Sequence, residues 1–214
     1  MASATSLVIR FGGLLFTSAQ VWAVIRRFPE SLPFKFITRM IWTPTMLLSS
    51  FNCDPIDDYV ILGSIPRDED DFIHIKETYG VNKIMTMNED WELVAVGDDG
   101  TKRTTLGIDR IQLATPDFNP PSLDVIKRAV DILQADREGG EIENRYYIHC
   151  KAGKGRSAVI VVCYVLSRYN MDVDTAIKYV KRHRPSVSLN EQQIDAIQQY
   201  YCKEVLAAHK RESI

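Results

Sequence analysis

Hydrophobic and polar residues alternate with two different periods along the chain from Tyr59 onward. Short runs of β-branched and aromatic residues indicate strands, whereas longer stretches with apolar residues three or four positions apart indicate helices. The segments predicted as strands are 59–65, 81–87, 110–114 and 145–148, with a further short strand at 93–96. The segments predicted as helices are 68–79, 122–137, 157–166, 174–183 and 190–208. This alternation predicts an α/β fold with a mainly parallel central sheet flanked by helices.

Residues at the predicted helix ends support these boundaries. Ser122 is placed to cap the helix that follows it, and Gly80 and Gly139-Gly140 fall where helices are expected to end. Pro185 stops the helix that ends at residue 183. Open sheets of this kind bind ligands beyond the carboxyl ends of their strands, so the residues that follow strands are the candidate site residues.

The segment from His149 to Ser157 lies where a predicted strand runs into a predicted helix. Gly153 and Gly155 allow a tight loop, so that backbone N–H groups and the positive end of the helix converge on one anion. The same field favours the Cys150 thiolate, which is a nucleophile for phosphorus. Arg156 offers planar, bidentate hydrogen bonds to phosphate oxygens. The residues of this predicted phosphate-binding loop are Lys151, Ala152, Gly153, Lys154, Gly155 and Arg156.

Two residues that flank the loop are expected to support its chemistry. The Ser157 hydroxyl is placed to stabilise sulfur as it leaves a phosphocysteine intermediate, and His149 is expected to orient the loop by hydrogen bonding rather than to exchange protons with substrate. The alternative is that Cys150 is a buried structural cysteine and the glycines form an ordinary turn. That alternative requires all nine residues of the string to coincide by chance.

The oxygen that leaves a phosphate ester needs a proton, so a general acid is expected near the loop. Asp117 is the best candidate, because it lies in a proline-rich loop directly after a predicted strand. Asp109 precedes the same strand and is expected at its other end. Asp124 lies in the first turn of a helix, where acidic residues are favoured for capping alone.

These motifs resemble the dual-specificity branch of the protein tyrosine phosphatases, and within it the mitochondrial phosphatases that act on phosphatidylglycerophosphate. The resemblance extends over most of residues 52–205. The stretch 89–92 is similar to an acidic-aromatic-acidic motif of that group, 113–117 to its general-acid loop, and 188–194 to a segment that supplies a glutamine to the site. The resemblance implies a fold of the dual-specificity type, a phosphocysteine intermediate and supporting roles for Glu89, Glu92 and Gln193.

The interior of the loop departs from this group. Lys154-Gly155 stands where Arg-Ser is expected, and with Lys151 it resembles the loop of the tensin-homologue phosphoinositide phosphatases. Phosphatidylglycerophosphate, a precursor of cardiolipin, is therefore the first substrate hypothesis, and phosphoinositides or phosphotyrosine and phosphoserine proteins are the alternative. A binding module without catalysis is a third hypothesis, and the presence of Cys150, Arg156 and a candidate acid argues against it.

The net charge of −2 is unevenly distributed. Residues 1–50 carry five basic groups and one acidic group, whereas the rest of the chain carries 21 basic and 27 acidic groups. An acidic body with a basic N-terminal segment argues against nucleic acid as a partner and indicates targeting or membrane contact. The predicted organisation is a targeting or membrane-associating extension (1–50), a catalytic domain (51–208) and a tail (209–214), in a monomeric protein.

Three hypotheses remain open for the start of the extension. Residues 1–29 contain no Asp or Glu, as in a mitochondrial transit peptide. The uncharged run Phe11–Ile25 is shorter than the about 20 residues of a spanning helix, so an interfacial anchor and a marginal transmembrane helix are the other two. The segment 34–42 interleaves basic and aromatic residues, as at a membrane surface or in a lid on the catalytic domain. With the resemblance, these features predict a mitochondrial inner-membrane enzyme with an anionic phospholipid substrate.

Neither the cysteines nor the histidines indicate a metal site or a disulfide framework. Their spacing matches no zinc motif, and four scattered cysteines suit a reducing compartment. Cys163 is expected in the core, and a disulfide between Cys53 and an oxidised Cys150 remains open. The prediction is therefore of an enzyme that needs no metal and no cofactor.

Overall fold

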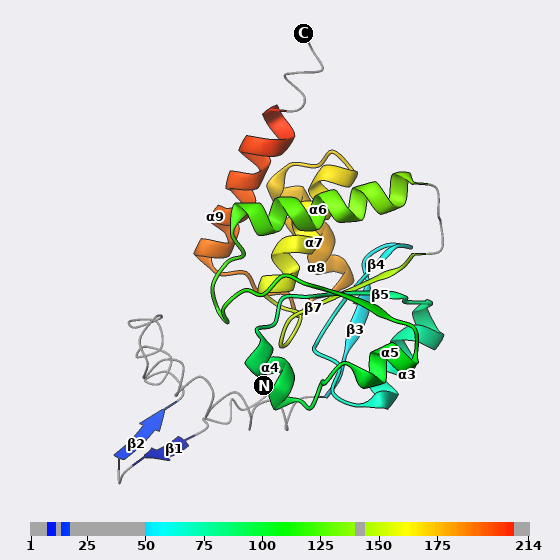
Figure 1. The fold of residues 1–214 in the computed structure, drawn as a ribbon. Coiled ribbons are helices and arrows are strands. Elements are labelled where there is room, and N and C mark those ends of the chain that lie inside the picture. The colour runs from blue at the N-terminus through cyan, green and yellow to red at the C-terminus, as the bar shows by residue number, and fades with distance from the viewer. Residues whose placement is uncertain (1–7, 12–13, 18–49, 140–143, 208–214) are drawn as a thin grey trace. The chain divides into compact units, whose positions relative to one another are not determined.

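The structure, a computed structural model, is shown in Figure 1. The described residues are 8–11, 14–17, 50–139 and 144–207. The chain divides into two units, residues 1–50 and residues 51–214.

In the first unit, β1 (Val8–Phe11) and β2 (Leu14–Thr17) pair in an antiparallel ribbon. These residues therefore form strands. A membrane-spanning helix, which is one of the three hypotheses for this segment, would require them to be helical. The remainder of the proposed targeting segment, including 34–42, lies outside the described residues, as does the 209–214 tail.

The second unit contains a five-stranded sheet with the order β3-β4-β7-β5-β6. The edge strand β3 is antiparallel to β4, and the other neighbouring pairs are parallel, which confirms the predicted mainly parallel sheet. The central strand, β7, ends at the candidate phosphate-binding loop. The strands are β3 (Cys53–Pro55), β4 (Val60–Gly63), β5 (Lys83–Thr86), β6 (Asp109–Gln112) and β7 (Tyr146–His149).

Helices cover both faces of this sheet, with α6, α7, α8 and α9 on one face and α3 and α5 on the other (Figure 1). Side chains of β7 alternate between the two layers: Tyr146 and Ile148 join the larger apolar core, and Tyr147 joins the smaller one. The helices are α3 (Glu69–Tyr79), α4 (Asp90–Ala95), α5 (Thr101–Thr105), α6 (Leu123–Glu138), α7 (Arg156–Arg168), α8 (Val173–His183) and α9 (Glu191–Tyr200), followed by a π-helical turn, η1 (Tyr201–Val205).

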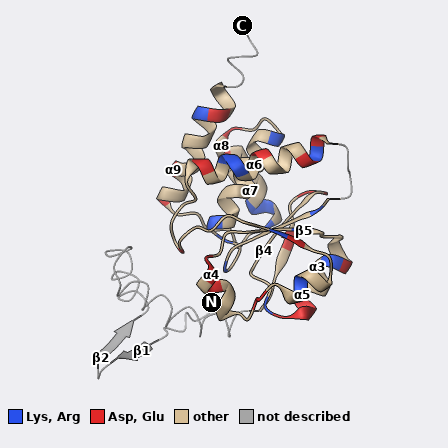
Figure 2. Ribbon diagram, in the orientation of Figure 1, with Lys and Arg blue, Asp and Glu red and all other residues tan. Residues whose placement is uncertain are grey.

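The helix α7 forms the centre of the larger core. All of its residues from Arg156 to Leu166 are buried, which explains why the sequence there is apolar on every side. By contrast, Figure 2 shows charged residues of both signs along α6, which packs on α7 with one face only. Among the described residues, no helix is long and apolar enough to cross a membrane.

The predicted helix ends are confirmed where capping groups determine them. Asp68 accepts a hydrogen bond from the Asp71 N–H at the start of α3, and Gly80 ends that helix in the left-handed conformation. Ser122 accepts from the Val125 N–H and caps α6.

The strand predicted at 93–96 is wrong. Glu89 and Glu92 form a reciprocal capping box that starts α4, so this apolar stretch continues a helix with Leu93 buried. The helix α5 was not predicted, and the single helix predicted over 190–208 is divided, because α9 ends at Tyr200 and η1 follows it.

Gly63 at the end of β4 provides a test of the packing of β4 against its two neighbours, β3 and β7. A Cβ atom there would lie 2.0 Å from the Tyr147 hydroxyl oxygen and 2.8 Å from the Cys53 Cβ. We expect Gly63→Ala to lower the free energy of unfolding by about 1–3 kcal/mol because the buried neighbours must shift. Gly139→Ala, at a right-handed helix end, should change it by less than about 1 kcal/mol. Equal urea midpoints for the two variants would contradict the packing described.

Candidate active site

The loop between β7 and α7 begins at Cys150, and α7 begins at Arg156. Gly153 has a φ of +65°, a conformation that favours glycine. A Cβ at this position would also lie 2.3 Å from the Gly63 carbonyl oxygen. The loop therefore passes so close to the end of β4 that only glycine fits.

Four consecutive carbonyl groups of the loop have hydrogen-bond partners outside it. The Lys151 oxygen accepts from the Ile65 N–H (3.2 Å), and the Lys154 oxygen accepts from the Ser188 N–H (3.0 Å). The oxygens of Ala152 and Gly153 both accept from Arg184, each at 3.0 Å. The N–H of a trans peptide points opposite to its C=O, so the N–H groups of residues 152–155 face the inside of the loop. This geometry is suited to bind an anion.

Arg156 is 2% exposed and is held by several acceptors. Its Nη1 and Nη2 atoms donate to the two carboxylate oxygens of Glu92 at 2.7 and 2.8 Å, and Nη1 also donates to the Thr115 carbonyl oxygen. Nη2 lies 2.9 Å from an Asp117 carboxylate oxygen. Burial opposes the charge, but the carboxylates of Asp117 and Glu92 outweigh it, so the pKa of Arg156 is raised. The guanidinium is thus permanently charged and fixed in orientation.

Cys150 is buried, and its sulfur accepts a hydrogen bond from the Ser157 hydroxyl at 3.2 Å. Burial alone would raise the pKa of the thiol. The Arg156 charge and the hydrogen bonds from Ser157 oppose that effect, and the net pKa of Cys150 is lowered. In contrast, the pKa of Cys163, which is buried in α7 among apolar groups, is raised. Of these two buried cysteines, Cys150 is therefore the one whose surroundings favour the thiolate form.

His149 is buried at the end of β7, with its Nδ1 atom 3.4 Å from the Cys150 carbonyl oxygen. Burial lowers its pKa to about 3, so the imidazole is neutral at neutral pH. This placement agrees with an orienting role and not with proton exchange.

The three candidate acids lie in different places. Asp117 has one oxygen on Arg156, and its other carboxylate oxygen, Oδ2, is buried with no hydrogen-bond partner. Asp109 is the first residue of β6, at the other end of the strand, where it pairs with Lys83. Asp124 lies in the first turn of α6. Of these carboxylates, only that of Asp117 meets the arginine of the loop.

Of the three residues expected to support the loop, Gln193 and Glu92 contact it and Glu89 does not. Gln193 caps α9 reciprocally with Asn190, and its amide nitrogen would lie 2.8 Å from a Cβ on Gly155, so it packs against the loop. Glu92 holds Arg156, as described above. Glu89 instead caps α4 and accepts a hydrogen bond from the Trp91 indole, so its role is to build the helix that carries Glu92.

The two loop lysines differ in environment. Lys151 is half-buried, and burial lowers its pKa although the carboxylates of Asp117 and Glu92 act against that shift. Lys154 is exposed to solvent. Any contribution of these two residues to substrate choice therefore comes from different depths of the site.

Arg184 is a further residue of the site that was not predicted from the sequence; it is 1% exposed and contacts two loop carbonyls. Basic residues in the last turn of a helix are common because they complement the helix dipole. Arg184 directly follows three of them, Lys181, Arg182 and His183, so the sequence gives no reason to single it out.

The strand order also separates Cys53 from Cys150. Cys53 pairs with Gly63, which pairs with His149, so Cys53 lies two strand spacings, about 9–10 Å, from the strand that leads to Cys150. A disulfide requires Cα atoms within about 7 Å, so the structure does not place these cysteines to form one. Within the described part of the chain, no group of three or more His, Cys, Asp or Glu residues could hold a metal ion.

Comparison with known proteins agrees with this geometry. A family model for the dual specificity phosphatase catalytic domain matches residues 78–203, so the chain belongs to this family. The fold and the family resemblance expected from the sequence are thereby confirmed.

Two relatives and one solved structure show the similarity in more detail. The phosphatidylglycerophosphate phosphatase PTPMT1 of Arabidopsis thaliana is 34% identical over 154 residues, which cover 72% of this chain but only 43% of the plant protein. Phosphatidylglycerophosphatase and protein-tyrosine phosphatase 1 of Rattus norvegicus is 26% identical, with 80% of this chain and 92% of the rat protein covered. A crystal structure of PTPMT1 in complex with PI(5)P has a TM-score of 0.66 at 23% identity and covers 73% of this chain and 98% of its own.

Ser157 provides a test of the thiolate. We expect Ser157→Ala to raise the pKa of Cys150 by about one to two units, because a hydrogen bond to a charged group contributes about 1.5–3 kcal/mol. The pH at which iodoacetamide reacts with Cys150 at half its maximal rate should therefore move upward. Ser167→Ala is the matched control, since Ser167 lies in the same helix but bonds to Tyr200. An unchanged pH midpoint in Ser157→Ala would show that the hydroxyl does not stabilise the thiolate.

Proposed function

We propose that this protein is a phosphatase that forms a phosphocysteine intermediate on Cys150. The observation that carries the proposal is the convergence of inward N–H groups, the fixed Arg156 guanidinium and a thiol with a lowered pKa at one loop. In the first step the thiolate attacks phosphorus, the S–P bond forms, and the P–O bond to the leaving alcohol breaks. Asp117 donates its proton to that oxygen.

The second step regenerates the enzyme. Asp117, now ionised, takes a proton from water as the water oxygen attacks phosphorus and the S–P bond breaks. Ser157 donates a hydrogen bond to the departing sulfur, and Arg156 with the loop N–H groups stabilises the phosphoryl oxygens throughout. His149 and Gln193 hold the loop in shape.

Substrate binding is expected to change what Asp117 contacts. Before substrate binds, Arg156 already contacts the carboxylates of both Glu92 and Asp117, beside the Cys150 thiolate. A phosphate dianion competes with Asp117 for Nη2 of Arg156 and repels its negative charge. Asp117 is therefore displaced from the arginine, and its carboxyl group is then free to meet the leaving oxygen as the general acid.

Phosphatidylglycerophosphate is the proposed substrate, and hydrolysis to phosphatidylglycerol on the route to cardiolipin is the proposed reaction. Support comes from the plant and rat relatives, whose names include this activity. Phosphoinositides are the second candidate, favoured by the PTPMT1 complex with PI(5)P and by the pair Lys151 and Lys154. The name of the rat relative also includes protein-tyrosine phosphatase, so phosphoproteins form a third substrate class.

Location and organisation are likewise proposed. The catalytic domain spans residues 51–208, and the basic extension 1–50 directs a monomeric enzyme to the mitochondrial inner membrane, where its phospholipid substrate lies. The basic residues and acid-free start of the extension support this placement.

A substrate panel tests both the chemistry and the specificity. Phosphate release should be measured from phosphatidylglycerophosphate, phosphoinositides including PI(5)P, and phosphotyrosyl peptides, with kcat/KM expected to be highest for phosphatidylglycerophosphate. Cys150→Ser should reduce release from every substrate by about 10⁴-fold or more, whereas Cys202→Ser, at an exposed position, should not. Persisting activity in Cys150→Ser would refute the mechanism, and a higher kcat/KM for another class would replace the substrate.

The role of Asp117 is tested by varying the leaving group. Asp117→Asn should slow hydrolysis about 10²–10⁴-fold for alkyl phosphates, whose oxygen needs a proton, and much less for nitrophenyl phosphates. Asp109→Asn, at the opposite end of β6, should leave both rates unchanged. An equal loss with both kinds of leaving group would assign the proton to another residue.

A further inference from the structure

Arg184 lies just after α8 and is one of the largest side chains in the structure that is almost completely buried. It does not contact Arg156 or Cys150 through any of its hydrogen bonds. Its Nε and Nη2 atoms donate to the carbonyl oxygens of Gly153 and Ala152, each at 3.0 Å. One planar guanidinium thus spans two successive peptide groups. It also donates to Asp54 and Asn52, and these four acceptors are more than the three N–H donors of a lysine can serve.

The direction of these two carbonyls decides the direction of the N–H groups that follow. Because each peptide is trans, turning the Ala152 and Gly153 oxygens toward Arg184 turns the N–H groups of Gly153 and Lys154 toward the inside of the loop. The other two outward carbonyls are held by backbone N–H groups, which no side-chain substitution removes. Among the described residues, Arg184 is therefore the side chain whose hydrogen bonds orient this half of the oxyanion site.

The charge of Arg184 is balanced by the edge of the sheet. Nη1 lies 2.6 Å from an Asp54 carboxylate oxygen, and Nη2 donates to the side-chain oxygen of Asn52. Asp54 belongs to β3 and Asn52 immediately precedes it. A buried guanidinium without such partners is costly, so its position depends on this strand.

We propose that Arg184 is a positioning residue of the phosphate-binding loop, and that Asn52 and Asp54 hold it in place. The strand β3 begins shortly after residue 50, where the first unit of the chain ends. The first residues of the second unit therefore shape the anion site through one side chain. This inference rests on the proposed function of the loop, because it concerns how the loop presents its N–H groups to a phosphoryl group.

The first test replaces Arg184 with lysine, which keeps the charge but not the fork. Vanadate resembles the transferring phosphoryl group, so its inhibition constant reports the alignment of the N–H groups directly. Removing one oxyanion donor elsewhere costs about 10²–10³ in rate, and misaligning two should cost about 10–100-fold. We expect Arg184→Lys to weaken vanadate inhibition and kcat/KM by the same factor. The pKa of Cys150, read from iodoacetamide kinetics, should rise with them.

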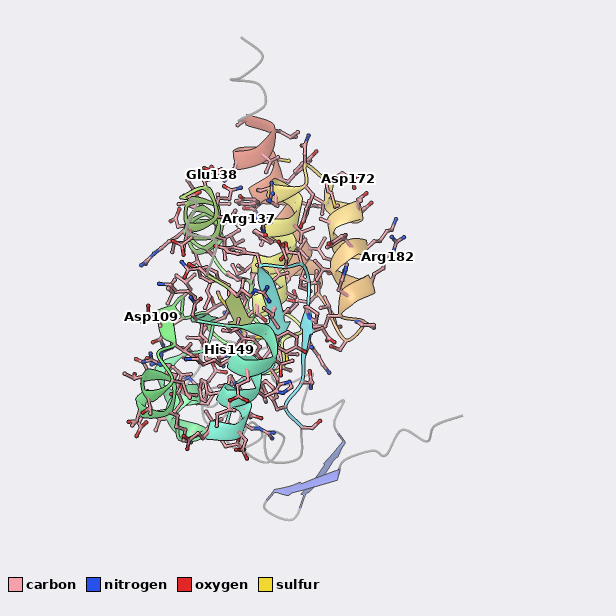
Figure 3. The ribbon with its side chains drawn as sticks, turned by 90° about the vertical axis from the view of Figure 1, so that its right-hand side faces the viewer. Asp109, Arg137, Glu138, His149, Asp172 and Arg182 are labelled. Carbon is pink, nitrogen blue, oxygen red and sulfur yellow. The ribbon has the colours of Figure 1, made fainter. Side chains whose placement is uncertain are left out.

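The matched control is Arg182→Lys, two residues away in α8. Arg182 is exposed, and Figure 3 labels it near the C-terminal end of that helix. This variant should keep the wild-type vanadate constant, kcat/KM and Cys150 pKa. All measurements are made below the unfolding temperature of each variant, so that a loss of stability alone moves none of the three values.

Asp54→Asn keeps the test decisive if Arg184→Lys fails to fold. The Asp54 side chain is 41% exposed, so its replacement is tolerated, and it should weaken vanadate inhibition in the same direction by about 3–10-fold. The inference is overturned if the folded variants, or Asp54→Asn alone, bind vanadate within about twofold of the wild type. Activity in Cys150→Ser would instead overturn the proposed function, so the two failures can be told apart.

Discussion

The anion site depends on hydrogen bonds that point away from it. A loop can turn its N–H groups toward a phosphate only if its carbonyl groups find acceptable partners elsewhere, because a buried unpaired carbonyl is costly. Here the partners come from the end of β4, from the segment after α8 and from Arg184. The shape of the loop is thus a property of the whole carboxyl edge of the sheet, although its sequence is local.

The buried pair of Arg156 and Glu92 also fixes a group of the anion site, through side chains and not through the backbone. Removing both charges from water is expensive, and their two short hydrogen bonds recover only part of that cost. What the pair supplies is a guanidinium with one orientation before substrate arrives, which avoids reorganisation during the reaction. The capping box that starts α4 fixes Glu92, so even this short helix helps to orient Arg156.

Much of this could be predicted from the sequence, because the relevant signals are local. The run from His149 to Ser157 contains both the glycine needed at a positive φ and the charged groups of the site, and Ser122 and Gly80 mark helix ends by their own chemistry. Arg184 could not be predicted, since its partners lie about 30 and 130 residues away along the chain. The strand expected at 93–96 failed because the reciprocal capping of Glu89 and Glu92 outweighed an apolar run too short to show a period.

Asn190 joins the acid loop to the rest of the site. Its side-chain oxygen accepts the Gln193 N–H at the start of α9, while its side-chain nitrogen donates to the Phe118 carbonyl oxygen, next to Asp117. Phe118 has a φ of +67°, so the chain is already bent at that point. The residue next to Asp117 and the first turn of α9 are therefore anchored by one side chain, so a change at Asn190 would reach both the acid loop and the helix that carries Gln193.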